Sequence, residues 1–302
     1  MPMTPSTFQP LRQAARYLRR FRSRIFVLKL GGELLADPAV RRALVEQACV
    51  LEACGIRIVI VHGGGPELDG LCQRLSIPVE KVAGRRVTTP EVLEAAQGAF
   101  CGTQVGLLAD LTAADVPCAG LSGMDGGLFT ARRRPPQEIL PDGASERVSV
   151  DFGLVGDLEK VDPALVHHLL EGGYLPVIAP LCSDGQGQVL NTNADTLAAA
   201  LAKALGAEKL FFLLAAPGLL ADPNNPESLV TFATPARVER MEAEGSIQGG
   251  MRPKVAAALT ALEGGVSAVH LVSGLLPDAL LAEVFTNEGS GTLLSLSEGE
   301  SA

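Results

Sequence analysis

The sequence predicts an α/β fold in which a mostly parallel sheet is covered by helices on both faces. Short apolar runs typical of buried parallel strands recur along the chain, at residues 26–30, 58–61, 175–179, 210–214 and 269–272. Helix starts are marked by pairs of a capping residue and proline: Asp37-Pro38, Thr89-Pro90, Asp162-Pro163 and Thr234-Pro235. Because strands and helices alternate, the connections are expected to be right-handed crossovers between parallel strands.

Length and composition are those of an acidic metabolic enzyme that is expected to be cytoplasmic. The 302 residues, 47% of them apolar, are enough for a sizeable core, and a net charge of −9 argues against a nucleic-acid partner. No apolar run reaches the roughly 18 residues that a membrane span needs. The 6 cysteines are scattered, and they form no metal or redox motif with each other or with the 4 histidines. A reducing compartment and no protein-bound metal cluster are therefore expected.

Residues 1–24 differ from the rest of the chain, because they carry arginines and no acidic residue. Their apolar side chains fall at helical spacing: Phe8, Leu11, Ala15, Leu18 and Phe21. We favour an amphipathic N-terminal helix that packs on another surface. A targeting segment is the alternative, although no small-residue cleavage site precedes the first strand.

The first strand carries a single lysine, Lys29, and ends on Gly31-Gly32. A glycine pair lets the backbone turn sharply and approach a ligand closely. In an open α/β sheet, ligands bind at the carboxyl ends of the strands, so Lys29 is well placed to meet a phosphate. The alternative is a solvated lysine on an edge strand followed by an ordinary turn.

The second strand ends in VHGGGPEL, where His62 precedes Gly63, Gly64 and Gly65, and Pro66 opens a helix. Consecutive glycines at a helix N-terminus let backbone N–H groups converge on an anion. The pattern is neither a Rossmann fingerprint nor a Walker A loop, so a dinucleotide fold is not indicated. A glycine-rich turn without a ligand is the alternative.

Arginines follow in two places. Arg85 and Arg86 lie in an expected hairpin, where one of them could clamp a carboxylate, although solvation is the commoner use of such a pair. After one or two buried helices over residues 92–111, the GLSGMDGG stretch suits a cleft wall. The run at residues 132–134 is expected to be solvated, at the tip of an exposed hairpin that extends to Arg147, although it could border the substrate mouth.

A polar cluster follows the strand at residues 175–179, where Asn191, Asn193 and Asp195 lead directly into an alanine-rich helix. Asn191 could hydrogen-bond a substrate and Asp195 could hold lysines in place, while plain helix capping is the alternative. Further along, Lys254 opens a helix after Gly249-Gly250. Alone it would suit a solvated surface lysine. The tail after Ser295 is polar and expected to be disordered.

Taken in order, these motifs resemble those of the amino-acid kinase family over most of the chain: KLGG, VHGGGPE, GRRVT, GLSGMDGG, GYLPVIAP, NTNAD, PGLL, GGMRPK and FTNEGSGT. The resemblance implies a three-layer αβα sandwich with an N-terminal helix (1–24), an amino-acid-substrate lobe (25–185), a nucleotide lobe (186–295) and a tail (296–302). It also implies transfer of a phosphoryl group from ATP, with Mg²⁺, to the side-chain carboxylate of N-acetyl-L-glutamate, on the route to arginine.

The resemblance assigns roles to single residues. Lys29 and Lys254 match the lysines that stabilise the transferring phosphoryl group, and Asp195 matches the aspartate that organises them. The positions matching substrate contacts are Gly64, Gly65, Arg86 and Asn191. The positions matching phosphate or nucleotide contacts are Gly31, Gly32, Pro217 and Gly218. A carboxylate nucleophile is already ionised at neutral pH, so the chemistry requires cations and positioning but no general base.

The resemblance also suggests assembly and regulation. The N-terminal helix is similar to the extension that links arginine-sensitive members into hexamers. An effector-arginine site is implied at Tyr17, His270, Glu283 and Gly289. Several positions depart from the family pattern: Glu33, Met124, Leu214-Ala215-Ala216, Ser273 and Leu275.

Two alternatives to this function remain open. One is a kinase of the same fold acting on another carboxylate, such as acetylaminoadipate or aspartate. The other is a regulatory or assembly homologue with weakened use of ATP, suggested by the apolar Leu214-Ala215-Ala216, because relatives place polar groups there.

Overall fold

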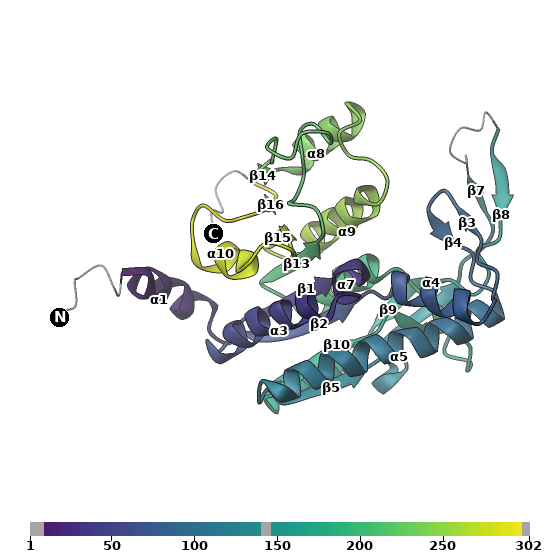
Figure 1. Ribbon diagram of the computed structural model, residues 1–302, viewed down its shortest axis with the longest axis horizontal. Helices are drawn as coiled ribbons and strands as arrows, with labels where there is room; N and C mark the ends of the chain where they lie inside the picture. Colours follow the sequence, from purple (N-terminus) through teal and green to yellow (C-terminus); the bar gives the residue numbers. More distant parts are fainter. Residues whose placement is uncertain (1–8, 140–145, 298–302) are drawn as a thin grey trace.

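A computed structural model describes residues 9–139 and 146–297 of the chain. The polar end at residues 298–302, expected to be disordered, and residues 1–8 of the N-terminal segment lie outside the described residues. The helix expected in the N-terminal segment is α1 (Gln9–Phe21), which projects from the body of the protein (Figure 1).

An eight-stranded sheet forms the centre of the molecule. Its strands, in order across the sheet, are β14 (Phe232–Ala233), β16 (Thr292–Leu294), β15 (Ala268–Ser273), β13 (Lys209–Leu214), β1 (Ile25–Leu30), β2 (Arg57–His62), β10 (Leu175–Ile178) and β5 (Cys118–Leu121). All neighbouring pairs are parallel except β15 and β16. The mostly parallel sheet expected from the sequence is therefore confirmed.

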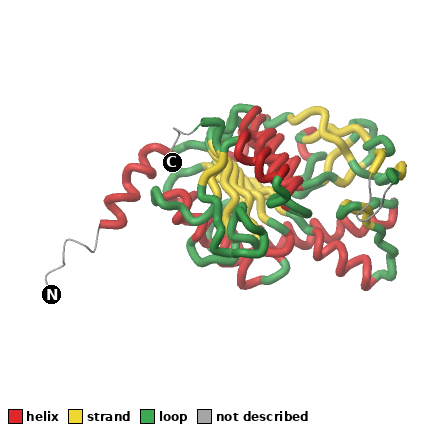
Figure 2. Tube along the Cα trace, turned by 90° about the horizontal axis from the view of Figure 1, so that it is seen from above, coloured by secondary structure: helices red, strands yellow, loops and turns green. Residues whose placement is uncertain are grey.

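Helices cover both faces of this sheet, as Figure 2 shows. One face packs against α1, α2 (Gly32–Leu35), α3 (Pro38–Ala53), α5 (Pro90–Ala113) and α10 (Ala279–Phe285). The other packs against α6 (Ala164–Glu171), α7 (Ala194–Ala204), α8 (Pro235–Ala243) and α9 (Met251–Glu263). Strand side chains alternate between the two cores, so that Val27 lies in one and Leu28 in the other.

A smaller four-stranded sheet lies beside the central one, with the order β12 (Val189–Asn191), β11 (Leu181–Ser183), β6 (Phe129–Arg133) and β9 (Gly156–Val161). Two hairpins project nearby (Figure 1): β3 (Lys81–Val82) with β4 (Arg85–Arg86), and β7 (Gln137–Ile139) with β8 (Val148–Val150). The helix α4 (Gly65–Arg74) packs against α5 in a third apolar cluster. The division into two lobes at residue 185 stays a prediction.

The expected helix starts are confirmed at Asp37, Thr89 and Thr234, each of which caps its helix through its side chain. At the fourth pair the helix begins one residue later than expected, because Pro163 itself occupies the N-cap position. Asp162 still accepts a hydrogen bond from the Ala164 N–H, at 3.2 Å.

The arginine run at residues 132–134 is not at a hairpin tip. Arg132 and Arg133 belong to β6, whose alternate residues Phe129 and Ala131 are buried. Arg133 pairs with Asp151, which follows β8, at 2.8 Å, and Arg134 pairs with Asp157 of β9 at 2.7 Å. The expected excursion begins only after this strand, at β7.

Candidate active site

The carboxyl ends of the parallel strands bring the two glycine-rich turns together. The Gly31 N–H donates to the carbonyl of Leu213 at 3.3 Å, and the Gly63 N–H donates to the carbonyl of Leu30 at 2.9 Å. The turns after β1, β2 and β13 therefore lie next to each other at one edge of the sheet. This is the edge at which ligands bind in open α/β sheets.

Lys29 and Lys254 meet on Asp195 in the layer between the sheet and helices α7 and α9. Lys29 Nζ lies 2.7 Å from Asp195 Oδ1, and Lys254 Nζ lies 3.3 Å from Oδ2. Lys29 comes from β1 and Lys254 from the first turn of α9. Asp195 lies in the first turn of α7, which the Asn193 side chain caps. The lysine pair expected from the sequence thus shares one buried carboxylate.

The charges of this cluster are well defined. Burial raises the pKa of Asp195, but the charges and hydrogen bonds of the two lysines outweigh burial and lower the pKa below its usual value. Lys29 and Asp195 are almost completely buried, with exposed fractions of 5% and 4%. Two ammonium groups against one carboxylate leave one net positive charge, which favours an anionic ligand.

The glycines form a cradle of backbone N–H groups. A Cβ atom on Gly32 would lie 3.0 Å from the nitrogens of both Gly64 and Gly65, so the absence of a side chain at Gly32 keeps the space over these amides open. Among the described residues, neither of these N–H groups donates to a backbone acceptor. Both lie at the N-terminal end of α4, where the helix dipole also favours an anion. Binding of an anion at Gly63–Gly65 stays a prediction.

Of the two other expected substrate residues, Arg86 contacts the glycine turn, and no described contact joins Asn191 to it. Arg86 pairs with Asp69 of α4 and donates to the Gly65 carbonyl at 3.4 Å. Asn191 donates to Thr88 Oγ1 at 3.3 Å. The guanidinium of Arg86 is thus held against the glycine turn, but by an internal carboxylate. Its part in binding a substrate carboxylate stays a prediction.

Asp69 is a partner of Arg86 that the sequence did not suggest. Burial raises the pKa of Asp69, but the hydrogen bonds and charges of Arg86 and Lys81 outweigh burial, so the pKa lies below its usual value. Lys81 Nζ lies 2.9 Å from Asp69 Oδ2, which ties the β3–β4 hairpin to α4. No sequence spacing marks this pair, because Asp69 and Arg86 meet only when the β3–β4 hairpin packs against α4.

Pro217 and Gly218, expected at the nucleotide site, lie in the turn after β13. A Cβ atom on Gly218 would lie 2.6 Å from Thr292 Oγ1, which accepts a hydrogen bond from the Leu219 N–H at 2.9 Å. This close approach explains why glycine occupies the position. Nothing described joins Pro217 to the lysine cluster, so the nucleotide role stays a prediction.

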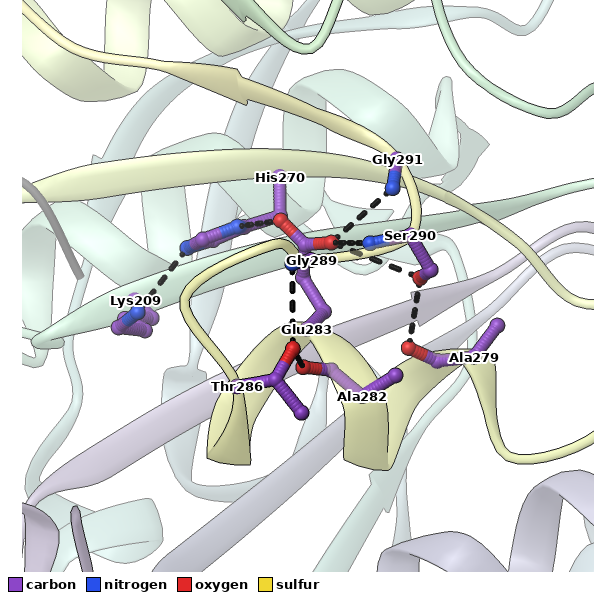
Figure 3. A network of polar contacts seen from close by, with 9 residues as sticks. All are labelled: Lys209, His270, Ala279, Ala282, Glu283, Thr286, Gly289, Ser290 and Gly291. Carbon is purple, nitrogen blue, oxygen red and sulfur yellow. Dashed lines mark hydrogen bonds and ion pairs between the residues drawn. The ribbon is translucent and has the colours of Figure 1, made fainter. Parts of the chain in front are cut away.

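Three of the four residues expected at an effector site, His270, Glu283 and Gly289, belong to a buried polar network (Figure 3). It lies on the opposite face of the sheet from the lysine cluster. His270 Nδ1 donates to Glu283 Oε1 at 2.7 Å. The other carboxylate oxygen accepts from the backbone N–H groups of Ser290 at 2.6 Å and Gly291 at 3.0 Å. Gly289 closes over this carboxylate, since a Cβ atom there would lie 2.8 Å from Oε2.

Lys209 completes this network and was missed from the sequence. Its Nζ lies 3.2 Å from His270 Nε2 and 4.9 Å from the centre of the Phe21 ring of α1. The sequence did contain a signal for Lys209, because it is a single lysine in an otherwise apolar strand, as Lys29 is in β1. Burial lowers the pKa of Lys209 to about 8 and that of His270 to about 4. His270 is therefore neutral at physiological pH.

Glu283 is ionised in this network. Burial raises its pKa, but the hydrogen bonds from His270 and from the two backbone N–H groups outweigh burial and lower the pKa to about 2. Tyr17 lies outside the network and contacts the following loop, where its hydroxyl donates to Asn287 Oδ1 at 2.5 Å. The structure thus brings His270, Glu283 and Gly289 together, whereas Tyr17 contacts Asn287 in the loop after α10. An effector role for these residues stays a prediction.

Two further observations concern the described part of the chain. No group of three or more metal-binding side chains occurs within residues 9–139 and 146–297. None of the helices in these ranges is long and apolar enough to cross a membrane.

Comparison with known proteins identifies relatives along nearly the whole chain. The model of the amino acid kinase family matches residues 24–273. The acetylglutamate kinase of Myxococcus xanthus is 57% identical over 97% of this chain and 96% of the relative. The acetylglutamate kinase of Halorhodospira halophila is 38% identical over 97% of this chain and 98% of the relative.

Solved structures give the same picture of the fold. An N-acetylglutamate synthase from Neisseria gonorrhoeae, complexed with coenzyme A and N-acetyl-glutamate, aligns with a TM-score of 0.81 at 28% identity. The alignment covers 96% of this chain but only 63% of that chain. A carbamate kinase from Giardia aligns with a TM-score of 0.64 at 15% identity, over 91% of this chain and 99% of that one, and supports the fold alone.

Proposed function

Because this chain belongs to the amino acid kinase family, we propose that it phosphorylates the side-chain carboxylate of N-acetyl-L-glutamate with ATP, in arginine biosynthesis. Its curated relatives carry the name acetylglutamate kinase over nearly their full length. The product is an acyl phosphate, and the enzyme is a phosphotransferase with a carboxyl group as acceptor.

The observation that carries the mechanism is the pair of lysines held by Asp195. Attack of a carboxylate on the terminal phosphate of ATP brings two anions together, so the barrier is largely electrostatic. The net positive charge of the cluster would oppose this repulsion. Lys29 and Lys254 would donate to oxygens of the transferring phosphoryl group, and Asp195 would keep both ammonium groups at fixed positions.

The glycine cradle supplies the second part of the site. The N–H groups of Gly64 and Gly65 would donate to the anion that meets the lysines, since Gly32 leaves room above them. Gly31 belongs to the same phosphate-approaching turn. Arg86 and Asn191 would complete the substrate side, and Pro217 and Gly218 the nucleotide side. No general base is needed, because the acceptor carboxylate is ionised at neutral pH.

Mg²⁺ would enter this site with the nucleotide. Both oxygens of Asp195 are paired with lysines, and the described residues contain no cluster of three or more metal-binding side chains. The ion would therefore be held mainly by the phosphate oxygens of ATP, as is common for Mg²⁺. It would supply charge neutralisation to those phosphates, beside the two lysines.

An acyl phosphate trap tests the function directly. The purified protein is incubated with acetylglutamate, ATP and Mg²⁺ in hydroxylamine, and the acyl hydroxamate is measured. Parallel reactions with acetylaminoadipate and with aspartate test the neighbouring substrates, and preference for either one would redirect the assignment. Calorimetric titration with ATP tests the regulatory alternative, because a homologue with weakened ATP use would release little or no binding heat.

Assembly, regulation and location belong to the same proposal. The amphipathic α1, which projects from the body, would link subunits into a hexamer, and light scattering measures the mass of the assembly. Arginine would act as an effector near Tyr17, His270, Glu283 and Gly289. An activity curve that stays flat up to millimolar arginine would remove this part. We place the enzyme in the cytoplasm, with other enzymes of amino-acid synthesis.

A further inference from the structure

His62 is a buried polar side chain that the proposed mechanism does not use. It ends β2 directly before the glycine turn and has an exposed fraction of 0%. Its register partner on β1 is Leu30, whereas Lys29 pairs with Val61. Because side chains alternate along a strand, His62 lies on the other face of the sheet from Lys29. It therefore cannot contact the reacting groups from where it sits.

The hydrogen bonding of His62 defines its protonation. Its Nδ1 lies 3.1 Å from the carbonyl oxygen of Gly63. A carbonyl oxygen only accepts, so Nδ1 must carry the proton. Burial lowers the pKa of His62 to about 4, which makes the ring neutral at physiological pH. Nε2 has no hydrogen-bond partner among the described residues, so this one bond is the polar contact of the ring.

The bond to Gly63 fixes the orientation of a peptide group in the cradle. The described chain contains no cis peptide bond, so the N–H of Gly64 points away from the Gly63 carbonyl that His62 holds. The nitrogen of Gly64 is one of the two that lie 3.0 Å from the position a Cβ atom of Gly32 would occupy. A peptide between two glycines can rotate with little steric hindrance, because neither residue has a Cβ atom.

We infer that His62 is a positioning residue whose Nδ1–H locks the peptide between Gly63 and Gly64, and thereby aims the Gly64 N–H at the anion bound in the glycine cradle. This inference rests on the proposed function. The preceding peptide, between His62 and Gly63, is also held, since the Gly63 N–H donates to the Leu30 carbonyl at 2.9 Å. With the Gly63 carbonyl bonded to His62 and the preceding peptide bonded to Leu30, the Gly64 N–H is in place before the substrate arrives, and no reorganisation is needed during the reaction.

Two substitutions separate this role from simple packing. His62→Leu fills the buried site with an apolar side chain and removes the hydrogen-bond donor. His62→Asn places an amide nitrogen at the same distance from the backbone as Nδ1. We expect His62→Leu to lower kcat/KM for acetylglutamate about 10-fold or more, and His62→Asn to stay within about 3-fold of the wild type. KM for ATP should change much less in both variants.

Further measurements make the outcome decisive. Thermal melting checks that each variant is folded, and if His62→Leu is not, His62→Gln takes its place, because its amide nitrogen lies one bond further out. The inference is overturned if His62→Asn loses as much activity as the variant without a correctly placed donor, or if neither variant loses activity. The ratio of wild-type to His62→Leu activity should also stay constant over about pH 6 to 9, since a neutral donor does not titrate there.

Failure of the inference and failure of the function remain distinguishable. A wild-type protein that forms no acyl hydroxamate overturns the proposed function, and the inference with it. A wild-type protein that is active, beside an equally active and folded His62→Leu variant, overturns the inference alone.

Discussion

Lys29 and Asp195 form a buried ion pair, with Nζ 2.7 Å from Oδ1, between the first strand of the central sheet and the first turn of α7. Lys254 reaches the other oxygen of the same carboxylate from a third element. Three segments far apart in the sequence thus converge on one charged group. Their convergence gives the first two predictions.

Replacing either lysine should impair the chemical step more than substrate binding. We expect Lys29→Ala and Lys254→Ala each to lower kcat roughly 10²-fold or more, with a smaller change in KM, as for loss of a transition-state donor. Steady-state kinetics with both substrates measures this. Lys203→Ala is the matched control, because Lys203 is exposed and lies on the same helix as Asp195. Unchanged kcat in both site variants would refute the roles of the lysines.

The stability that Asp195 provides should depend on pH in a defined direction. Its pKa is lowered in the folded protein, so its contribution is present above the unfolded pKa of about 4 and is lost as pH falls through the folded value. The difference in free energy of unfolding between wild type and Asp195→Asn should therefore shrink as the solution is acidified. Urea unfolding at a series of pH values measures it. A difference that grows towards acid would contradict the lowered pKa.

A methyl group on Gly32 should damage the cradle without general unfolding. Its Cβ atom would lie 3.0 Å from the nitrogens of Gly64 and Gly65, closer than most real contacts. We expect Gly32→Ala to lower kcat/KM for acetylglutamate at least about 10-fold. Gly70→Ala in α4 is the control, since nothing lies within 4 Å of its Cβ position. That control should keep its activity and gain about 0.5–1 kcal/mol of stability.

Lys209 should make the protein more stable as the solution becomes alkaline. Burial lowers its pKa to about 8 from 10.5, so between these values the unfolded chain binds more protons than the folded one. The free energy of unfolding then rises with pH, by up to about 3 kcal/mol across the window. The rise should be absent in Lys209→Met. Denaturant unfolding from pH 7 to pH 10 of both proteins, compared by difference, gives the result, and identical slopes would disprove it.

Much of the fold followed from local signals. The capping pairs at Asp37, Thr89 and Thr234 specify helix starts through contacts within one turn, so no distant residue is needed to find them. Buried strands such as β13 are apolar after their first residue because both faces are covered. The arginines of β6 were misplaced because their strand is buried on one side only, and its partner strands come later in the chain.

The candidate site was predictable only where a motif marked it. Lys254 alone would have suited a solvated surface lysine, and its contact with Asp195 depends on how α7 and α9 pack. Lys209 was missed because its partners come from a neighbouring strand, at His270, and from α1, at Phe21. Asp69 was missed for the same reason, since it lies on α4 and meets Arg86 of the β3–β4 hairpin only in the folded protein. Long-range pairs of this kind leave no spacing pattern in the sequence.

The pairing of β1 with β13 bears on how the two predicted lobes are joined. These strands are joined in parallel register from Phe26 opposite Lys209 to Leu30 opposite Leu213, in the middle of the sheet. Backbone hydrogen bonds therefore join residues 26–30 to residues 209–213 through the middle of one continuous sheet. The segments before and after the predicted lobe boundary at residue 185 are tied together strand to strand, and not by the connecting chain alone.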